Sequence, residues 1–241
     1  ISRRHFSSIG FKKIVGVSKS MLDLYHLLNQ IKSKNVTTLL YGESGTGKNL
    51  IAKTLHQISL RRDRPNIAVN CPAIPSELLE SELFGHEKGA FTGAIERKDG
   101  KFLIANSGTI FLDEIGDMSP SLQAKILRVL ESGEIERVGG AETIKIDVRI
   151  ISATNQNLEQ RIKDGKFRQD LFHRINVFPM RIPPLRDRKE DIHPTAMSIL
   201  KGLKKKHNIT TGCISHDGMR ALQSYDWPGN VRELENTLER I

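Results

Sequence analysis

The chain has 241 residues, of which 38% are hydrophobic and 27% are charged. This length predicts one large domain, or one large and one small domain, and the composition excludes wholesale disorder. Lys and Arg outnumber Asp and Glu by 37 to 28, which gives a formal charge of +9. Such a basic balance is compatible with a nucleic-acid partner, with a phosphorylated ligand, or with a basic solvated surface.

Membrane insertion, secretion and disulfide bonding are not expected from the sequence. No apolar run reaches the ~18–20 residues that a membrane helix needs, and no signal peptide opens the chain. Cys71 and Cys213 lie far apart and lack a metal-binding spacing, which favours a reducing cytoplasm. Because the first residue is Ile1 rather than Met, we expect the chain to be a piece of a longer protein.

Short apolar runs rich in β-branched residues alternate with helical patterns along most of the chain. This alternation is typical of an α/β fold with a mostly parallel sheet whose strands are covered on both faces. Ser119 followed by Pro120 predicts the start of a helix, as N-cap and first helical residue. Five strands are predicted, over residues 37–41, 66–70, 109–113, 148–153 and 176–182.

The pattern changes at Pro183 and Pro184, which interrupt both helix and strand. Beyond them only helical patterns follow, over residues 191–206, 215–224 and 230–241. We therefore predict an α/β domain over residues 1–182 and a small helical domain over residues 183–241. The basic stretch 201–207 is interpreted as a solvated helix face rather than as a nucleic-acid contact.

The segment after the first predicted strand has the pattern GxxxxGK and precedes a predicted helix. In this context the pattern indicates a loop whose backbone N–H groups and helix N-terminus bind phosphate. Lys48 would reach the β- and γ-phosphates of a nucleotide. Asn49 stands where Ser or Thr usually contacts Mg²⁺, so its carbonyl oxygen could bind the metal or a water, or other groups hold the metal. The loop comprises Gly42, Glu43, Ser44, Gly45, Thr46, Gly47, Lys48 and Asn49.

The third predicted strand ends in two acids, Asp113 and Glu114, which is the Walker B pattern. Because successive strand side chains point to opposite sides, the two acids are expected to have different tasks. Asp113 would hold Mg²⁺, and Glu114 would polarise the attacking water. Asn70 ends the second predicted strand and Asn155 follows the fourth, at the same carboxyl ends, where either could orient Glu114 or the water and sense the γ-phosphate.

Three arginines are candidates for phosphate contacts. Arg168 and Arg174 are six residues apart, so on one straight helix they would point about 120° apart and serve different subunits. The alternative for each is a surface salt bridge. Arg232 lies in the first turn of the last predicted helix, after the expected N-cap Asn230. A cation there is unfavourable for the helix dipole, which indicates an anionic partner such as a nucleotide phosphate.

One loop between the second and third strands combines a single aromatic residue with small ones. Burial of a Phe is worth about 1.5–3 kcal/mol, so Phe91 either packs under a turn or awaits a partner that buries it. The loop comprises Gly89, Ala90, Phe91, Thr92, Gly93 and Ala94.

The sequence GAFTGA at 89–94 resembles the signature loop of the bacterial sigma-54-dependent transcription activators, the NtrC-like branch of AAA+ ATPases. This resemblance implies an AAA+ P-loop fold, with a five-stranded sheet, helices on both faces and a small helical lid. Further similar segments are GESGTGK at 42–48, SELFGHEKGAFTGA at 81–94, GTIFLDEIGDM at 108–118, FRQDLFHR at 167–174, PPLRDRKEDI at 183–192 and WPGNVREL at 227–234.

The resemblance also implies roles at the nucleotide site. The phosphate loop and the two acids would bind and hydrolyse ATP with Mg²⁺. Asn70 matches the switch asparagine that restrains the catalytic Glu, and Asn155 matches sensor I. Arg232 matches sensor II on the lid, whereas Ile14 and Val15 resemble the segment beside adenine.

The remaining implied roles concern partners. Arg168 and Arg174 match the arginine fingers that reach the ATP of a neighbouring subunit in a homo-oligomeric ring, usually a hexamer. Phe91 and Thr92 match the residues that touch sigma-54, so the ring would remodel RNA polymerase holoenzyme. DNA would be bound through a helix-turn-helix domain that this chain does not contain.

One departure from the family pattern supports an alternative function. The position of Asn49 is commonly Glu in the family, so the arrangement of Mg²⁺ could differ here. With the charge of +9, Asn49 supports a non-hydrolysing regulator that uses ATP only for assembly and DNA binding. A DNA-translocating AAA+ remodeller is disfavoured by the GAFTGA loop.

Overall fold

The computed structural model describes residues 14–208 and 212–240, and by its internal contacts the chain forms two compact units. The sheet unit comprises residues 31–41 and 55–180. The lid unit comprises the described residues of 14–30, 42–54 and 181–240. Residues 1–13 of the predicted α/β domain and Ile241 of the last predicted helix lie outside the described residues.

A five-stranded sheet in the order β2-β5-β8-β1-β9 confirms the predicted α/β architecture. The pairs β2–β5, β5–β8 and β8–β1 are parallel. Central strand β8 is buried along its whole length, as expected of an apolar strand that is covered on both faces. The strand bounds are β1 Thr38–Tyr41, β2 Asn66–Asn70, β5 Thr109–Asp113, β8 Arg149–Thr154 and β9 Phe178–Arg181.

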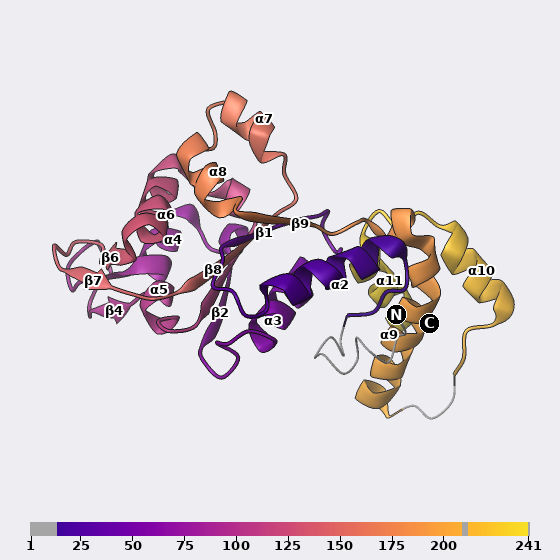
Figure 1. Ribbon diagram of the computed structural model, residues 1–241. Helices are drawn as coiled ribbons and strands as arrows, with labels where there is room; N and C mark the ends of the chain where they lie inside the picture. Colours follow the sequence, from indigo (N-terminus) through magenta and orange to yellow (C-terminus); the bar gives the residue numbers. More distant parts are fainter. Residues whose placement is uncertain (1–13, 209–211, 241) are drawn as a thin grey trace. The chain divides into compact units, whose positions relative to one another are not determined.

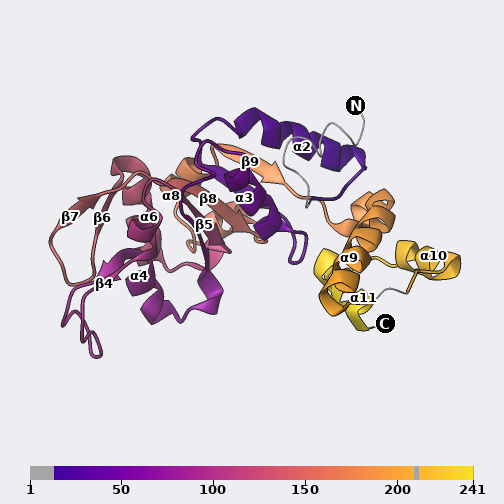
Figure 2. The same ribbon diagram turned by 90° about the horizontal axis from the view of Figure 1, so that it is seen from below.

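The helices of the sheet unit share one apolar core with the strands, and Leu112, Phe102 and Ile126 are fully buried in it. Helices α4 and α6 lie beside each other in Figures 1 and 2. As predicted, Ser119 caps α6, because its Oγ accepts the N–H of Leu122 at 3.4 Å. The elements are η1 Cys71–Ala73, α4 Ser76–Phe84, α5 Lys101–Ile104, η2 Ile115–Asp117, α6 Pro120–Ser132, α7 Leu158–Lys163 and α8 Gln169–Ile175.

Two small hairpins that the sequence did not predict also belong to the sheet unit. Strand β3 (Gly85–His86) pairs antiparallel with β4 (Lys98–Asp99), and β6 (Glu134–Glu136) pairs antiparallel with β7 (Thr143–Lys145). Figure 2 shows β4, β6 and β7 gathered at one end of this unit. Strands of two or three residues are too short to carry a recognisable alternation of apolar and polar residues.

The lid unit contains the helical C-terminal part of the chain and packs around Trp227, Leu234 and Ile192. The predicted helices are present with small shifts at their ends, and a 3-10 segment precedes the first of them. Helices α9 and α11 lie side by side (Figure 1). The helices that lie wholly or mostly in this unit are α2 Lys19–Ile31, α3 Lys48–Gln57, η3 Leu185–Asp191, α9 Ile192–His207, α10 His216–Ser224 and α11 Asn230–Arg240.

The boundary between residues 182 and 183 stays a prediction. The contacts group residues 14–30 and 42–54 with the helices after residue 181, so the two units are not consecutive stretches of chain. Among residues 14–208 and 212–240, no helix is long and apolar enough to cross a membrane.

Candidate functional site

The phosphate loop connects β1 to α3 and requires glycine at two positions. Gly47 has φ +104, and a Cβ built on it would meet no atom within 4 Å, so this face of the loop is open to a ligand. Gly45 has φ +78, and its Cβ would lie 2.2 Å from the carbonyl oxygen of Gly229. Only glycine adopts these backbone angles without strain and allows these close approaches. The loop therefore fits a phosphate group.

Lys48 is the first residue of α3 and is 6% exposed. Its Nζ donates to the carbonyl oxygens of Gly42 at 2.8 Å and of Glu43 at 3.4 Å. The loop thus wraps around the ammonium group and keeps a positive charge at its centre. Asn49 follows on the exposed face of the same helix turn.

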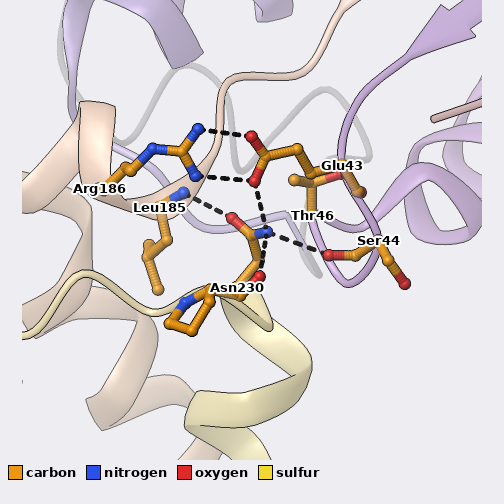
Figure 3. Close-up of polar contacts among 7 residues, drawn as sticks. Glu43, Ser44, Thr46, Leu185, Arg186 and Asn230 are labelled. Carbon is orange, nitrogen blue, oxygen red and sulfur yellow. Dashed lines mark hydrogen bonds and ion pairs between the residues drawn. The ribbon is translucent and has the colours of Figure 1, made fainter. Parts of the chain in front are cut away.

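A polar network joins the phosphate loop to the C-terminal helices within the lid unit (Figure 3). Arg186 donates two hydrogen bonds to the Glu43 carboxylate, at 2.8 and 2.5 Å. These bonds hold the pKa of Glu43 below its ordinary value. Asn230 donates to Glu43 Oε2 at 3.2 Å and to the Ser44 carbonyl at 3.0 Å. The sequence did not reveal this network.

Asn230 does not act as the predicted N-cap. Its side chain is fully buried, and its Oδ1 accepts the N–H of Leu185 at 2.8 Å instead of an N–H of its own helix. Glu233 takes over part of the capping, because its Oε2 accepts the N–H of Gly229 at 2.8 Å. A φ of +53 at Asn230 sets the turn into α11, a conformation that Asn tolerates better than most residues.

Arg232 lies at the phosphate loop, whereas the anionic partner expected from its place in the helix stays a prediction. Its Nη1 donates to Ser44 Oγ at 3.2 Å, and the neighbouring N–H of Val231 donates to the Gly45 carbonyl at 3.0 Å. A further cation that the sequence did not single out, Arg188, is 3% exposed and donates to the Thr46 carbonyl at 3.3 Å. Burial lowers the pKa of Arg188.

The segment expected beside adenine is tied to the lid helices. The carbonyl oxygen of Ile14 accepts a hydrogen bond from the Tyr25 hydroxyl at 3.1 Å, and Val15 follows it directly. Asp191 accepts the N–H groups of Val17 and Ser18, the latter at 2.8 Å. Burial, followed by the charge of Asp191, raises the pKa of Tyr25 to about 12. These contacts fix the backbone of residues 14–18 within the lid unit.

The sheet unit brings the two acids and the two asparagines together at one edge. Asp113 ends β5, in register with Asn70 at the end of β2. Glu114 Oε2 accepts the backbone N–H of Asn155 at 2.9 Å, just beyond β8. The prediction that strand alternation points the two acids to opposite sides is wrong. Glu114 lies beyond the end of the strand and has the left-handed angles φ 55 and ψ 51. The turn, and not the strand pleat, directs its carboxylate.

Arg168 and Arg174 do not lie on one helix, so the angle of about 120° does not apply. Arg168 precedes α8 and binds Asp170 through two hydrogen bonds of 3.0 and 2.6 Å, which lowers the pKa of Asp170. Arg174 is in the last turn of α8, with its Nη2 3.6 Å from Glu131. Their side chains are 45% and 57% exposed, and exposed pairs of this kind are weak. Both arginines are therefore accessible.

The loop Gly89–Ala94 is closed on itself and only partly buries its aromatic residue. The N–H of Gly89 donates to the Ala94 carbonyl at 2.8 Å, and the N–H of Ala94 donates to the Phe91 carbonyl at 2.9 Å. The Phe91 ring lies edge-on to the His86 ring, 5.0 Å between centroids, and Phe91 is 37% exposed. One side of Phe91 therefore packs on the stem of the loop, and the other side faces solvent.

Arg137 anchors the stem of this loop to the second hairpin. Its side chain is 4% exposed and contacts Glu87 at 3.3 Å, Asp99 at 3.0 Å and Glu142 at 3.4 Å. These three acids come from the loop stem, from β4 and from the β6–β7 turn. The sequence did not mark Arg137, because two of its three partners, Glu87 and Asp99, are 50 and 38 residues away in the chain.

A preformed metal cluster is not visible in the part of the chain that the structure describes, where no group of three or more His, Cys, Asp or Glu side chains gathers. Mg²⁺ at nucleotide sites is usually held by one or two carboxylates together with substrate phosphates. Asp113, at the end of a strand, is a donor of that kind, so the residues present fit such an ion.

Comparison with known proteins identifies the two parts of the chain. The family model described as "Sigma-54 interaction domain" matches residues 14–181, and that described as "AAA+ ATPase lid domain" matches residues 186–241. The DNA-binding transcriptional activator HyfR of Escherichia coli (strain K12) is 51% identical over 240 residues, which are 100% of this chain and 36% of HyfR. The Nif-specific regulatory protein of Klebsiella pneumoniae is 50% identical over 231 residues, 96% of this chain and 44% of that protein.

A solved structure of NtrX from Brucella abortus in complex with ATP has a TM-score of 0.89 and 41% identity, and the match covers 95% of this chain and 50% of that one. The chain spans less than half the length of these two curated relatives. The family match over most of the chain, the five-stranded sheet and the helical lid confirm what the GAFTGA resemblance implied: this chain belongs to the sigma-54 interaction domain family of AAA+ proteins.

Proposed function

We propose that this chain is an ATP-hydrolysing motor that assembles into a ring and remodels sigma-54 RNA polymerase holoenzyme to activate transcription. The observation that carries the proposal is the phosphate loop with Lys48 at its centre and Arg232 beside it, in a family member that also has the loop Gly89–Ala94. The complex of NtrX with ATP supports the choice of nucleotide.

ATP binding is assigned to the lid unit. The backbone N–H groups of the loop, from Gly45 to Lys48, and the N-terminus of α3 would hold the phosphates. Arg232 would contact the phosphates from α11, and Ile14 and Val15 would lie beside adenine. The full loop in this role comprises Gly42, Glu43, Ser44, Gly45, Thr46, Gly47, Lys48 and Asn49.

Hydrolysis is assigned to the edge of the sheet unit. Mg²⁺ would neutralise charge on the phosphates and be held by Asp113. Glu114 would polarise the attacking water, and the N–H of Asn155 fixes the carboxylate of Glu114 by its bond of 2.9 Å. Asn70, in register with Asp113, would act as the switch that restrains Glu114.

Ring assembly would complete each site from the neighbouring subunit. Arg168 and Arg174 are exposed, and each pairs with one exposed acid among the described residues, so exchange for a neighbour's γ-phosphate costs little. An arginine supplied in trans stabilises the transition-state charge of phosphoryl transfer. A homo-oligomeric ring, with six subunits expected from the family, is the assembly that we propose for this exchange.

The loop Gly89–Ala94 is proposed to contact sigma-54 through Phe91 and Thr92. A partly exposed Phe held by a closed turn offers apolar surface to a partner. We further propose that DNA is bound by a helix-turn-helix domain outside this sequence, and that the protein works in the cytoplasm with its polymerase. As domains of the sequence, residues 1–182 are proposed to form the α/β core and residues 183–241 the helical lid domain.

Two measurements test this function. Steady-state ATPase activity should rise more than linearly with protein concentration, since each site needs its neighbour. A transition-state analogue of the phosphoryl group should cause the chain to co-migrate with sigma-54. If nucleotide drives assembly and DNA binding but no turnover is found at any concentration, the function is the non-hydrolysing regulator that Asn49 suggests.

A further inference from the structure

A second group of cations lies in the sheet unit, at the edge opposite to the strand carboxyl ends. Lys32 and Lys34 precede β1, Arg61 precedes β2, and Arg149 is the first residue of β8. The parallel pairing of β1 with β8, of β8 with β5 and of β5 with β2 brings the amino ends of these strands to one side of the sheet. The four cations line a cavity of about 180 Å³, and none of its lining residues is acidic.

Arg149 is the buried cation of this cavity. Its side chain is 2% exposed, and its Nε, Nη1 and Nη2 are buried without a hydrogen-bond partner among the described residues. A guanidinium group keeps its charge at neutral pH and carries five N–H donors. A buried charge without a counter-ion is strongly unfavourable, and its donors need acceptors.

The neighbouring side chains add positive charge instead of neutralising it. Burial, followed by the charge of Arg61, lowers the pKa of Arg149 to about 10. Asp147 is engaged by Arg61, whose Nη2 donates to its carboxylate at 2.6 Å. Lys32 and Lys34 are exposed and form no ion pair with a described residue. An anion is therefore the ligand that this cavity fits.

We propose that the cavity binds a small oxyanion, namely a phosphate group, held by Arg149 from inside and by Lys32 and Lys34 at the opening. At about 180 Å³ the cavity is smaller than the ~300–1,000 Å³ of sites for drug-sized ligands, which favours a single phosphate group over a whole nucleotide. The planar fork of arginine matches phosphate oxygens, and lysine adds point charge. Ser33 and Asn35, whose side chains carry hydrogen-bond donors, also line the cavity.

This site is distinct from the phosphate loop. Open α/β sheets bind nucleotide beyond the carboxyl ends of their strands, whereas Arg149 begins β8 at the other end. A phosphate in the cavity would link the chain before β1 to the starts of β2 and β8. The sheet unit would then be stabilised by the ligand wherever phosphate is available.

The test titrates potassium phosphate at constant ionic strength, with the phosphate loop disabled by Lys48→Ala, and follows thermal unfolding and heat of binding. We expect a saturable rise in unfolding temperature. Arg149→Met should abolish that rise yet leave the ligand-free protein at least as stable, because an apolar side chain replaces an unpaired buried charge. Lys32 and Lys34 are exposed, so the double variant Lys32→Gln/Lys34→Gln leaves the core intact and should fold. It should weaken the affinity for phosphate about tenfold.

Lys163→Gln on α7 removes one positive charge, as Arg149→Met does, and is the matched control that should leave phosphate binding unchanged. Competition by a short DNA duplex through the same residues would assign the phosphate group to a nucleic-acid backbone, and binding that DNA does not affect would assign it to the free ion. Either outcome supports the site. The absence of a saturable rise, or a rise that persists in both the Arg149→Met and the double-lysine variant, overturns it.

Discussion

Replacement of Asn230 by Ala should destabilise the protein through a single buried side chain. In the native structure Asn230 Oδ1 accepts the buried N–H of Leu185 at 2.8 Å, and Nδ2 donates to the Ser44 carbonyl at 3.0 Å and to Glu43. Alanine removes all of these bonds at once. Leu185 is fully buried, so water does not replace the lost acceptor.

The magnitude follows from two contributions. A buried N–H left without an acceptor costs about 1–3 kcal/mol. Alanine at φ +53 costs up to about 1 kcal/mol more than asparagine, which tolerates left-handed angles. The Glu43–Arg186 pair is exposed and adds little either way. The sum is about 1–4 kcal/mol, which corresponds to a fall in unfolding temperature of roughly 2–16 °C for a chain of this size.

Two variants make the measurement specific. Asn230→Gly also loses the hydrogen bonds but accepts the positive φ, so it should be less destabilised than Asn230→Ala. Asn236→Ala removes an exposed side chain from the same helix and should shift stability by less than about 0.5 kcal/mol. Thermal unfolding of all three, measured without nucleotide, gives the comparison. If Asn230→Ala is as stable as Asn236→Ala, the proposed role of the network in holding Leu185 is refuted.

Further predictions concern catalysis, partner binding, the loop and pH. Glu114→Ala should bind ATP, measured by equilibrium titration, but lose most of the steady-state turnover; undiminished hydrolysis would remove Glu114 from its role. Phe91→Ala should keep ATPase activity and thermal stability but lose co-migration with sigma-54, and unfolding of the domain would instead identify Phe91 as core. Gly47→Ala should abolish ATP binding, because φ +104 costs a residue with Cβ about 1–3 kcal/mol and the new methyl fills the open face. Burial lowers the pKa of His56, so the folded state favours the neutral imidazole, and the linked stability is present above pH ~6.5 and is lost as the pH falls below it. His56→Gln should flatten that part of a profile of stability against pH. An unchanged slope would contradict the assignment.

Local patterns in the sequence determined the elements and the motifs. The strands, the start of α6 and the phosphate loop depend on apolar periodicity, capping and glycine, which act over a few residues. Each was predicted within a residue or two of its position in the structure. Family membership followed from the same short segments, and the family model over residues 14–181 confirmed it.

Only the tertiary structure decided which charged and polar side chains meet. Glu43 and Arg186 are 143 residues apart, and no local pattern specifies that pairing or the acids around Arg137. The direction of Glu114 depended on a left-handed turn, where strand alternation no longer applies. The unpartnered Arg149 is the same kind of feature: its sequence context is an ordinary buried strand, and only the folded sheet unit shows a guanidinium group without an acceptor beside a cationic cavity. The sequence alone thus predicted the secondary-structure elements, the fold class and the nucleotide-binding motifs, because these depend on patterns that extend over a few residues. The polar contacts around the phosphate loop, Arg137 and Arg149 depend on the tertiary structure, because most of them join residues that are distant in the chain.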